Sequence, residues 1–287
     1  MLARLFVAFQ YLVPQHWLTA LVWRIARIRH TATKNFLITK FVAMYDVDLD
    51  DVLRRVPDDF ATLNDFFTRE LNDAARPVSG DSRSIVSPVD GTVSLAGAIQ
   101  GDSLIQAKGI DYSLADLLAA DIDEANAYVD GNFATIYLAP YNYHRVHAPV
   151  DGQLISANYV PGDLFSVNQT TVATVRGLFR RNERLIMRFT TNQGPAAVIF
   201  VGALNVGSIS TPWSGEIRPR KHGVVEALSL SRASTTLERG DLLGWFNMGS
   251  TVILLLPAGC SEWHDNLQAG ATLRVGESIG QLSSATR

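Results

Sequence analysis

A serine, two histidines and an aspartate, far apart in the chain, are the residues best suited to chemistry. Ser250 follows Gly249 near the C-terminal end, His144 and His147 lie near the middle, and Asp90 lies in the first third. A serine hydroxyl is a poor nucleophile at neutral pH, and a histidine oriented by an aspartate can activate it. We therefore predict that Ser250 is a nucleophile, that His147 is its base and that Asp90 orients the imidazole of His147.

The surroundings of Ser250 differ from those of a hydrolase serine. Apolar residues before and after it predict a strand, and Met248 and Val252 stand where the G-x-S-x-G motif needs glycines. Gly249 leaves its own carbonyl unhindered and its backbone permissive. We expect Ser250 to attack the backbone at Gly249. A serine hydrolase or peptidase that uses the same triad on an external bond is the alternative.

The geometry of the histidine pair depends on the local structure. Three residues separate His144 from His147, so they point to opposite faces in a strand and share a side in a turn or helix. Pro140 and Pro149 bracket the segment and favour an irregular conformation.

A zinc site is a rival interpretation of these histidines. His144, His147, Cys260 and His264 could supply four ligands, but their spacing matches no strong zinc motif. Cys260 is the only cysteine, which excludes an internal disulfide. We expect no metal.

The chain beyond Ser84 is predicted to form mainly β-strands. Short apolar or alternating runs there are separated by Gly, Pro, Asp and Asn. They cover residues 91–95, 134–138, 152–159, 185–190, 196–201 and 251–256. We expect a short helix at residues 112–120.

Two internal repeats refine this architecture. Residues 88–93 (PVDGTV) and 149–154 (PVDGQL) share a turn before a strand, and residues 238–244 and 273–280 share a turn similar to that of biotinyl and lipoyl carriers. We predict an α+β fold, mainly β, in which amphipathic N-terminal helices precede a pseudo-symmetric β-sandwich of the barrel-sandwich-hybrid type. A non-enzymatic carrier is a third interpretation, but no lysine has the Met-Lys-Met context of a biotinyl carrier.

The N-terminal segment is predicted to be helical and basic. Residues 1–45 contain no acidic residue, although the net charge of the chain is −3. Apolar side chains fall on one helical face in residues 2–13 and again in 17–28, and a third helix is expected at 34–43. Shorter helices are expected at 49–55 and 63–71.

These helices are predicted to lie in the plane of a membrane surface. Gln10, Pro14, Gln15 and His16 interrupt the apolar runs, whereas a spanning helix needs about 20 apolar residues. Aromatic and basic residues without acids favour an interfacial position on anionic lipid. A helical hairpin packed on the protein body is the alternative. We divide the chain into a helical membrane-associating region, 1–75, and a catalytic β domain, 76–287.

Several motifs, in one order along nearly the whole chain, match a known family. They are NDFFTR (64–69), QAKG (106–109), YSL (112–114), YHRVH (143–147), VPGDLFSVN (160–168), RNER (181–184) and MGST (248–251). Together they resemble the bacterial phosphatidylserine decarboxylase proenzymes, which are pyruvoyl-dependent membrane enzymes that cleave themselves. That family often has leucine where this chain has Met248, which is a conservative change.

The resemblance implies a two-stage chemistry. Ser250 Oγ would attack the carbonyl carbon of Gly249, which separates a large chain, 1–249, from a small chain, 250–287. β-Elimination and hydrolysis would turn residue 250 into a pyruvoyl group, the covalent cofactor. Its ketone would form a Schiff base with phosphatidylserine, and loss of CO2 would give phosphatidylethanolamine. The resemblance assigns His144 to the later reaction, in proton transfer to the decarboxylated carbon.

The loop at residues 160–168 is the expected substrate site. We expect Phe165, Ser166 and Asn168 to bind the substrate, with Ser166, Asn168 and backbone amides holding its phosphodiester or carboxylate. An ordinary turn that caps a strand is the alternative. The expected partners are phosphatidylserine and anionic lipid, at the cytoplasmic face of a bacterial membrane. A homodimer is left open, and nucleic acid is not expected.

Overall fold

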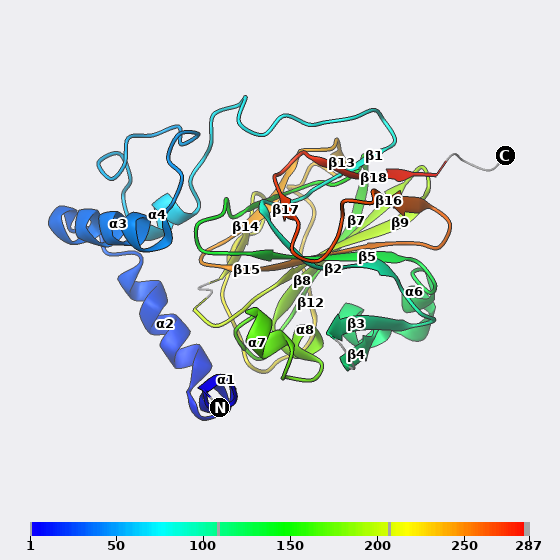
Figure 1. The fold of residues 1–287 in the computed structure, drawn as a ribbon, viewed down its shortest axis with the longest axis horizontal. Helices are drawn as coiled ribbons and strands as arrows, with labels where there is room; N and C mark the ends of the chain where they lie inside the picture. Colours follow the sequence, from blue (N-terminus) through cyan, green and yellow to red (C-terminus); the bar gives the residue numbers. More distant parts are fainter. Residues whose placement is uncertain (1, 108–109, 206–207, 284–287) are drawn as a thin grey trace.

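Figure 1 shows the computed structural model, which describes residues 2–107, 110–205 and 208–283. Lys108 and Gly109 of the QAKG motif lie outside the described residues. The N-terminal helices extend from one side of a body built from β-sheets, and a long connection leads from α4 to β1 (Figure 1). The expected fold class, mainly β with helices, is confirmed.

Helices occupy the N-terminal region and short insertions in the β body. They are α1 (Leu2–Leu12), α2 (Gln15–Ile25), α3 (Thr31–Tyr45), α4 (Leu63–Phe67), α5 (Leu114–Leu118), α6 (Ile122–Asn126), α7 (Gln169–Val172) and α8 (Leu178–Arg181). Pro14 separates α1 from α2 because proline cannot donate a helical hydrogen bond. None of the helices in the described ranges is long and apolar enough to cross a membrane.

Three of the expected helices differ from the structure. Residues 49–55 form turns and not a helix, because Asp48 Oδ1 accepts the N–H of Asp50 at 3.0 Å and Val52 pairs with Leu71. The helix expected at 63–71 ends at Phe67. The segment 112–120 begins in a strand, and only Leu114–Leu118 is helical.

The largest sheet has nine strands and is antiparallel throughout. Its order is β12 (Glu226–Ala227), β7 (Gly152–Val160), β8 (Arg184–Thr191), β9 (Gly194–Val201), β15 (Ser250–Leu256), β5 (Asn132–Leu138), β2 (Gly91–Ala98) and β17 (Thr272–Leu273), with β13 (Thr236–Leu237) also on β7. All seven residues of β15 are buried, because the strand lies between β9 and β5. Each of the six strands expected from apolar runs is present in this sheet.

Three smaller sheets complete the body. They are β11 (Gly215–Ile217), β10 (Ile209–Thr211), β14 (Leu242–Phe246) and β6 (Arg145–His147); β1 (Ser84–Val86), β18 (Ser278–Leu282) and β16 (Ser261–Trp263); and β3 (Ser103–Ala107) with β4 (Ile110–Ser113). Each of these strands has only three to five residues. Such short runs carry little periodicity, which is why the sequence did not predict them.

Buried apolar side chains form two separate clusters. The larger one fills the β body. The smaller one, here called the helical core, lies between α3, α4 and their connections. Its members are Ala26, Ile38, Phe41, Val47, Phe60, Leu63, Phe66 and Phe67. Met248, two residues before Ser250, packs against the helical core. The N-terminal region is therefore in contact with the segment that leads to Ser250.

Candidate active site

Ser250 begins β15 in the middle of the nine-stranded sheet. It pairs with Leu138 at the end of β5. Ser250 is only 1% exposed, and its Oγ has no hydrogen-bond partner among the described residues. Burying a hydroxyl without a hydrogen-bond partner costs folding free energy, so this Oγ is a candidate for a chemical role. The expected strand setting of Ser250 is confirmed.

The backbone just before Ser250 is strained. Met248 has φ of 100°, a region that residues with a Cβ atom avoid. Such a conformation costs on the order of 1–3 kcal/mol and persists only where surrounding contacts enforce it. For Met248 that contact is the helical core. By contrast, a Cβ added to Gly249 would meet no atom within 4 Å, so the space around this glycine is open.

His144 is fully buried immediately before β6. Its Nε2 lies 3.0 Å from the carbonyl oxygen of Ala139, which can only accept a hydrogen bond. Nε2 therefore carries the proton, and Nδ1 is the basic nitrogen. Nδ1 is buried without a partner among the described residues. Burial, assisted by the positive charge of Arg69, lowers the pKa of His144 to about 3, so the ring is uncharged at neutral pH.

His147 ends β6 with the opposite tautomer. Its Nδ1 lies 2.6 Å from the carbonyl oxygen of Gly240, so Nδ1 donates and Nε2 is the basic nitrogen. Nε2 is also buried without a partner in the described part of the chain. Gly240 has φ of 90°, a conformation suited to glycine. Burial lowers the pKa of His147 below its ordinary value.

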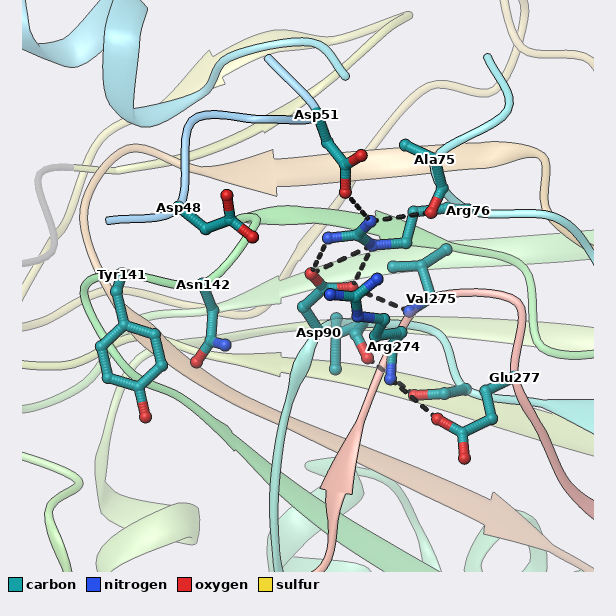
Figure 2. Close-up of polar contacts among 12 residues, drawn as sticks. Asp48, Asp51, Ala75, Arg76, Asp90, Tyr141, Asn142, Arg274, Val275 and Glu277 are labelled. Atoms are coloured by element: carbon teal, nitrogen blue, oxygen red, sulfur yellow. Dashed lines mark hydrogen bonds and ion pairs between the residues drawn. The ribbon is translucent and has the colours of Figure 1, made fainter. Parts of the chain in front are cut away.

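Asp90 is buried directly before β2 and is engaged by Arg76. Its carboxylate accepts hydrogen bonds from Arg76 Nε at 2.9 Å, from Arg76 Nη2 at 2.7 Å and from the N–H of Val275 at 2.8 Å. Figure 2 shows Arg76 between Asp90 and Asp51, with Asp51 Oδ2 2.8 Å from Arg76 Nη1. The carboxylate is thus fixed by a bidentate ion pair and a backbone amide.

The four predicted catalytic residues gather around the end of β5. Strands β2 and β15 flank β5, and Thr92, Tyr137 and Thr251 share one row of the sheet. Asp90 and Ser250 therefore approach the end of β5 from its two sides. Because neighbouring strands lie about 4.8 Å apart, the backbones of β2 and β15 are separated by roughly 10 Å.

Different backbone contacts place the two histidines near the end of β5. The N–H of His147 donates to the carbonyl oxygen of Pro88 at 2.8 Å, which holds His147 beside the turn containing Asp90. His144 instead bonds Ala139, next to the partner of Ser250. Among the hydrogen bonds that the structure describes, none joins Asp90 to His147, and none joins either histidine to Ser250. The charge of Asp90 nevertheless acts on His147, where it opposes the effect of burial on the pKa.

A cavity of about 220 Å³ opens beside Ser250. The loop at 160–168 and the segment after β9 line one side, and the N-terminal helices line another. The lining residues include Ser166, Val167, Asn168, Ala203, Leu204 and Asn205 from the β body, with Val22, Phe41, Tyr45 and Phe67 from the helical region. Most of these side chains are apolar, and the sequence did not predict that the N-terminal helices would contribute to this site.

The three expected substrate residues are divided between two places. Ser166 and Asn168 line the cavity with Ser250. Phe165 does not; its ring lies 4.9 Å from that of Tyr11 and 4.6 Å from the guanidinium of Arg181. The side chain of Asn168 accepts the N–H of Thr171 at 2.9 Å and so caps α7.

Two glutamines of the N-terminal region hold this loop. Gln10 Oε1 accepts the N–H of Ser166, and Gln15 Oε1 accepts the N–H of Leu164, both at 2.8 Å. Both glutamines are buried. Their binding to the backbone of the loop explains why polar residues stand in the apolar runs of α1 and α2.

Several residues that contact the candidate catalytic side chains or the segment before Ser250 were not predicted from the sequence. Phe67 stacks on His144, Arg76 binds Asp90, and Asn247 bonds Ser208, Ser210 and Asn64 just before the strained Met248. Asn64 and Phe67 belong to the NDFFTR motif, and that motif was the sequence feature that could have indicated them. Arg76 lies in a segment with no motif or periodicity that could have indicated its role.

The four candidate zinc ligands are not brought together. His144 and His147 bond backbone carbonyls through one ring nitrogen each. In the described ranges, no three His, Cys, Asp or Glu side chains are grouped so that they could hold a metal ion.

Comparison with known proteins identifies the family. The family model described as phosphatidylserine decarboxylase matches residues 63–281, and a second model, described as PSD, matches residues 5–46. The chain therefore belongs to the phosphatidylserine decarboxylase family.

Similar proteins span nearly the full chain. A protein of Saccharophagus degradans is 44% identical over 98% of each chain, and one of Alcanivorax borkumensis is 45% identical over 99% of this chain and 98% of its own. A protein of Methylococcus capsulatus is 45% identical over 96% of both. Each is named phosphatidylserine decarboxylase proenzyme.

Proposed function

We propose that this chain is a proenzyme that cleaves itself between Gly249 and Ser250 and then converts phosphatidylserine to phosphatidylethanolamine and CO2. The observation that carries the proposal is the buried, unpartnered Oγ of Ser250 beside a strained backbone, in a chain whose relatives are named proenzymes. A hydrolase serine would need access to an external bond, whereas Ser250 is 1% exposed and begins a central strand.

The first stage breaks the backbone. Ser250 Oγ attacks the carbonyl carbon of Gly249, the C–N bond breaks, and an ester joins the two residues. Loss of the Cα proton of residue 250 then expels the carboxylate of Gly249 and leaves dehydroalanine. Water replaces the nitrogen, which leaves as ammonia. Release of the backbone strain at Met248 favours cleavage. The open space at Gly249 leaves room for its carbonyl carbon to become tetrahedral during the attack.

His147 is the proposed base for this stage. Its Nε2 is an unprotonated nitrogen with a lowered pKa, which keeps it available at neutral pH. The carbonyl of Gly240 fixes the tautomer, a task that the sequence had given to Asp90. Asp90 then serves through its charge, which stabilises the imidazolium once the proton has moved. Arg76 fixes the position of that charge.

The residues around Ser250 fit a pyruvoyl group at position 250. The cavity of about 220 Å³ adjoins that residue, and no partner of Oγ would be lost on its conversion. The group would supply a ketone that captures the substrate amine and accepts the electron pair left by CO2.

His144 is the proposed proton carrier of the second stage. The amine of the substrate arrives as an ammonium and must lose a proton before it can react. Nδ1 of His144 is uncharged and free to take up a proton, and because the pKa of this ring is low, the proton once held would pass readily to the carbon that has lost CO2. Ser166 and Asn168, which line the cavity, are proposed to hold the polar headgroup. Phe165 supports the loop from behind, against Tyr11.

Membrane association is proposed for the N-terminal region, 1–75, with residues 76–287 as the catalytic domain. Leu12 is 83% exposed, Trp17 67% and Phe9 61%, which is costly in water but favourable in a lipid interface. Arg24 and Arg29 are exposed nearby in the sequence and would attract anionic lipid. We place this peripheral contact on the cytoplasmic face of a bacterial membrane and leave the homodimer open.

A pseudo-symmetric barrel-sandwich hybrid is the proposed architecture of the β body. Backbone hydrogen bonds support it in matched pairs. Val86 donates to Pro149 while His147 donates to Pro88, and Ser87 exchanges bonds with 276–277 as Ala148 does with 240–241. Strands β2 and β7 also bulge at the same place, the third residue after Gly91 and after Gly152.

Mass measurement under denaturing conditions, combined with an assay of phosphatidylethanolamine formation, tests the proposed function. We expect fragments 1–249 and 250–287, with the small one lighter than a serine-terminated peptide by one ammonia. We expect Ser250→Ala to remain one chain without activity. A small fragment with an ordinary N-terminal serine would favour the hydrolase. An intact wild-type chain that is fully active would also contradict the proposal.

Native chromatography of the cleaved protein tests the fragments further. They should elute together, because β15 pairs with both β5 and β9, and β18 lies between β1 and β16.

A further inference from the structure

The NDFFTR motif places an aromatic ring on His144. Phe67, the last residue of α4, is 1% exposed, and its ring stacks on the imidazole with centroids 4.0 Å apart and planes inclined by 28°. The same ring lines the cavity beside Ser250. Phe67 therefore covers one face of the imidazole and also forms part of the cavity wall.

The same motif places a buried cation behind the loop that carries His144. Arg69 is 3% exposed, and its Nη2 donates to the carbonyl oxygens of Tyr141 at 3.0 Å and Asn142 at 3.3 Å. Asn142 Oδ1 accepts the N–H of Ala139 at 2.7 Å, and Ala139 in turn accepts from His144. Arg69 thus braces the turn whose first residue orients the imidazole.

Arg69 also acts on His144 through its charge. Burial lowers the pKa of Arg69 to about 10, so it stays positive at neutral pH and opposes protonation of His144. Other charged groups on the packed elements have partners of their own. Asp65 of α4 pairs with Arg54 at 2.8 Å, and Glu70 pairs with Arg145 of β6 at 3.0 Å. Strand β14, which bonds the carbonyl of His144, contains no charged residue.

We propose that Phe67 and Arg69 are positioning residues that hold His144 uncharged, with Nδ1 as its free nitrogen, ready to carry a proton. The inference rests on the proposed role of His144 in decarboxylation. Neither residue needs to bond the substrate: Arg69 does not line the cavity, and Phe67 offers only its ring.

The expected kinetic effect falls on turnover and not on substrate binding. Arg69→Gln should lower kcat by about tenfold to a hundredfold, because small displacements of a catalytic group have effects of this size. KM should change little. Loss of the positive charge should raise the pKa of His144 and shift the acidic limb of the kcat profile to higher pH. Arg69→Lys keeps the charge and should leave that limb in place while kcat still falls. Phe67→Leu should also lower kcat.

Nuclear magnetic resonance of 15N-labelled histidines provides a readout that does not depend on turnover. In the uncleaved Ser250→Ala chain, His144 should be the Nε2–H tautomer, with its signal assigned by comparison with a His144→Asn variant. Adding Arg69→Gln should raise the pKa of His144 or mix its tautomers. Arg188→Gln is the matched control. Arg188 is 9% exposed and also bonds a backbone carbonyl, that of Leu118 at 3.1 Å, but it is not among the residues of the site.

The outcomes separate this inference from the proposed function. If His144→Ala turns over normally, the role of His144 fails, whatever Arg69 does. If His144→Ala is inactive but Arg69→Gln leaves the histidine tautomer, its pKa and the pH profile unchanged, the positioning role alone is overturned. Equal effects of Arg69→Gln and Arg188→Gln would likewise reduce Arg69 to a structural residue.

Discussion

At the scale of single residues, two backbone carbonyls give His144 and His147 opposite tautomers. His144 and His147 lie three residues apart, yet each donates one ring nitrogen to a different backbone carbonyl, Ala139 for one and Gly240 for the other. The nitrogens left free are therefore Nδ1 in His144 and Nε2 in His147. Opposite tautomers allow one short segment to present two bases in different directions.

This division predicts different defects for the two alanine variants. His147→Ala should slow self-cleavage, because the proposed base for Ser250 is lost. His144→Ala should still cleave but should release CO2 at least about a hundredfold more slowly, the usual contribution of a general acid or base. Fragment formation and turnover are to be measured on the same sample, with His264→Ala as a control. A His144→Ala chain that fails to cleave would assign both histidines to maturation.

The candidate residues of the site could be proposed from the sequence, but their hydrogen bonds could not. Ser250, His147 and Asp90 were suggested by their chemistry, and they do gather around the end of β5. Arg76 as the partner of Asp90, and Gly240 as the partner of His147, depend on long-range packing. No local sequence pattern marks either partner. In a catalytic triad Asp90 would bond His147, but here Arg76 bonds Asp90 and the carbonyl of Gly240 bonds His147.

At the scale of elements, α1 has two faces in different surroundings. Phe9 and Leu12 are exposed, whereas Gln10 is 1% exposed and binds both the N–H of Ser166 and the hydroxyl of Thr171. The apolar periodicity predicted the helix correctly. It could not reveal that the interrupting glutamines bind a loop 149 to 156 residues further along the chain, because a polar residue in such a pattern has many explanations.

The two faces of α1 should be separable by mutation. Gln10→Leu removes the acceptor of the Ser166 N–H and leaves that partly buried donor without its partner, which costs about 1 kcal/mol locally. It should raise KM for phosphatidylserine without weakening binding to anionic vesicles. Phe9→Ser with Leu12→Ser should weaken vesicle binding while the activity on detergent-dispersed substrate persists. Equal loss of both properties in both variants would show that α1 acts only as a structural unit.

At the scale of the whole molecule, the site joins two bodies with separate cores. The β body supplies Ser250, the histidines and Asp90, and the helical region supplies Phe67, Arg69 and part of the cavity wall. The sequence predicted N-terminal helices followed by strands, because apolar periodicity changes from helical to strand-like along the chain. It could not predict their contact at Met248, which only the folded chain brings to the helical core.

A buried acid links the cavity wall to the sheet of the β body. Glu183 is fully buried, its Oε2 accepts the hydroxyl of Tyr159 at 2.6 Å, and its Oε1 has no partner in the described part of the chain. The neighbouring Asn182 bonds the backbone of Phe165 and the carbonyl of Gly202, so it joins the two segments that continue into the cavity lining. Burial raises the pKa of Glu183 to about 7.

The raised pKa makes the stability of the whole fold depend on pH. The folded state holds a proton on Glu183 up to about pH 7, whereas the unfolded chain releases it near the ordinary value of 4.5. Stability from this group is therefore fully present below 4.5 and is lost as the pH rises to about 7, by on the order of 3 kcal/mol in unfolding free energy. Glu183→Gln keeps an acceptor for Tyr159 and cannot ionise, so urea unfolding of the uncleaved Ser250→Ala chain should show a flatter pH dependence with this substitution. Glu262→Gln, at an exposed acid, should leave the slope as it was. An unchanged slope in Glu183→Gln would mean that Glu183 is ionised in the fold, with its charge stabilised by groups other than Tyr159.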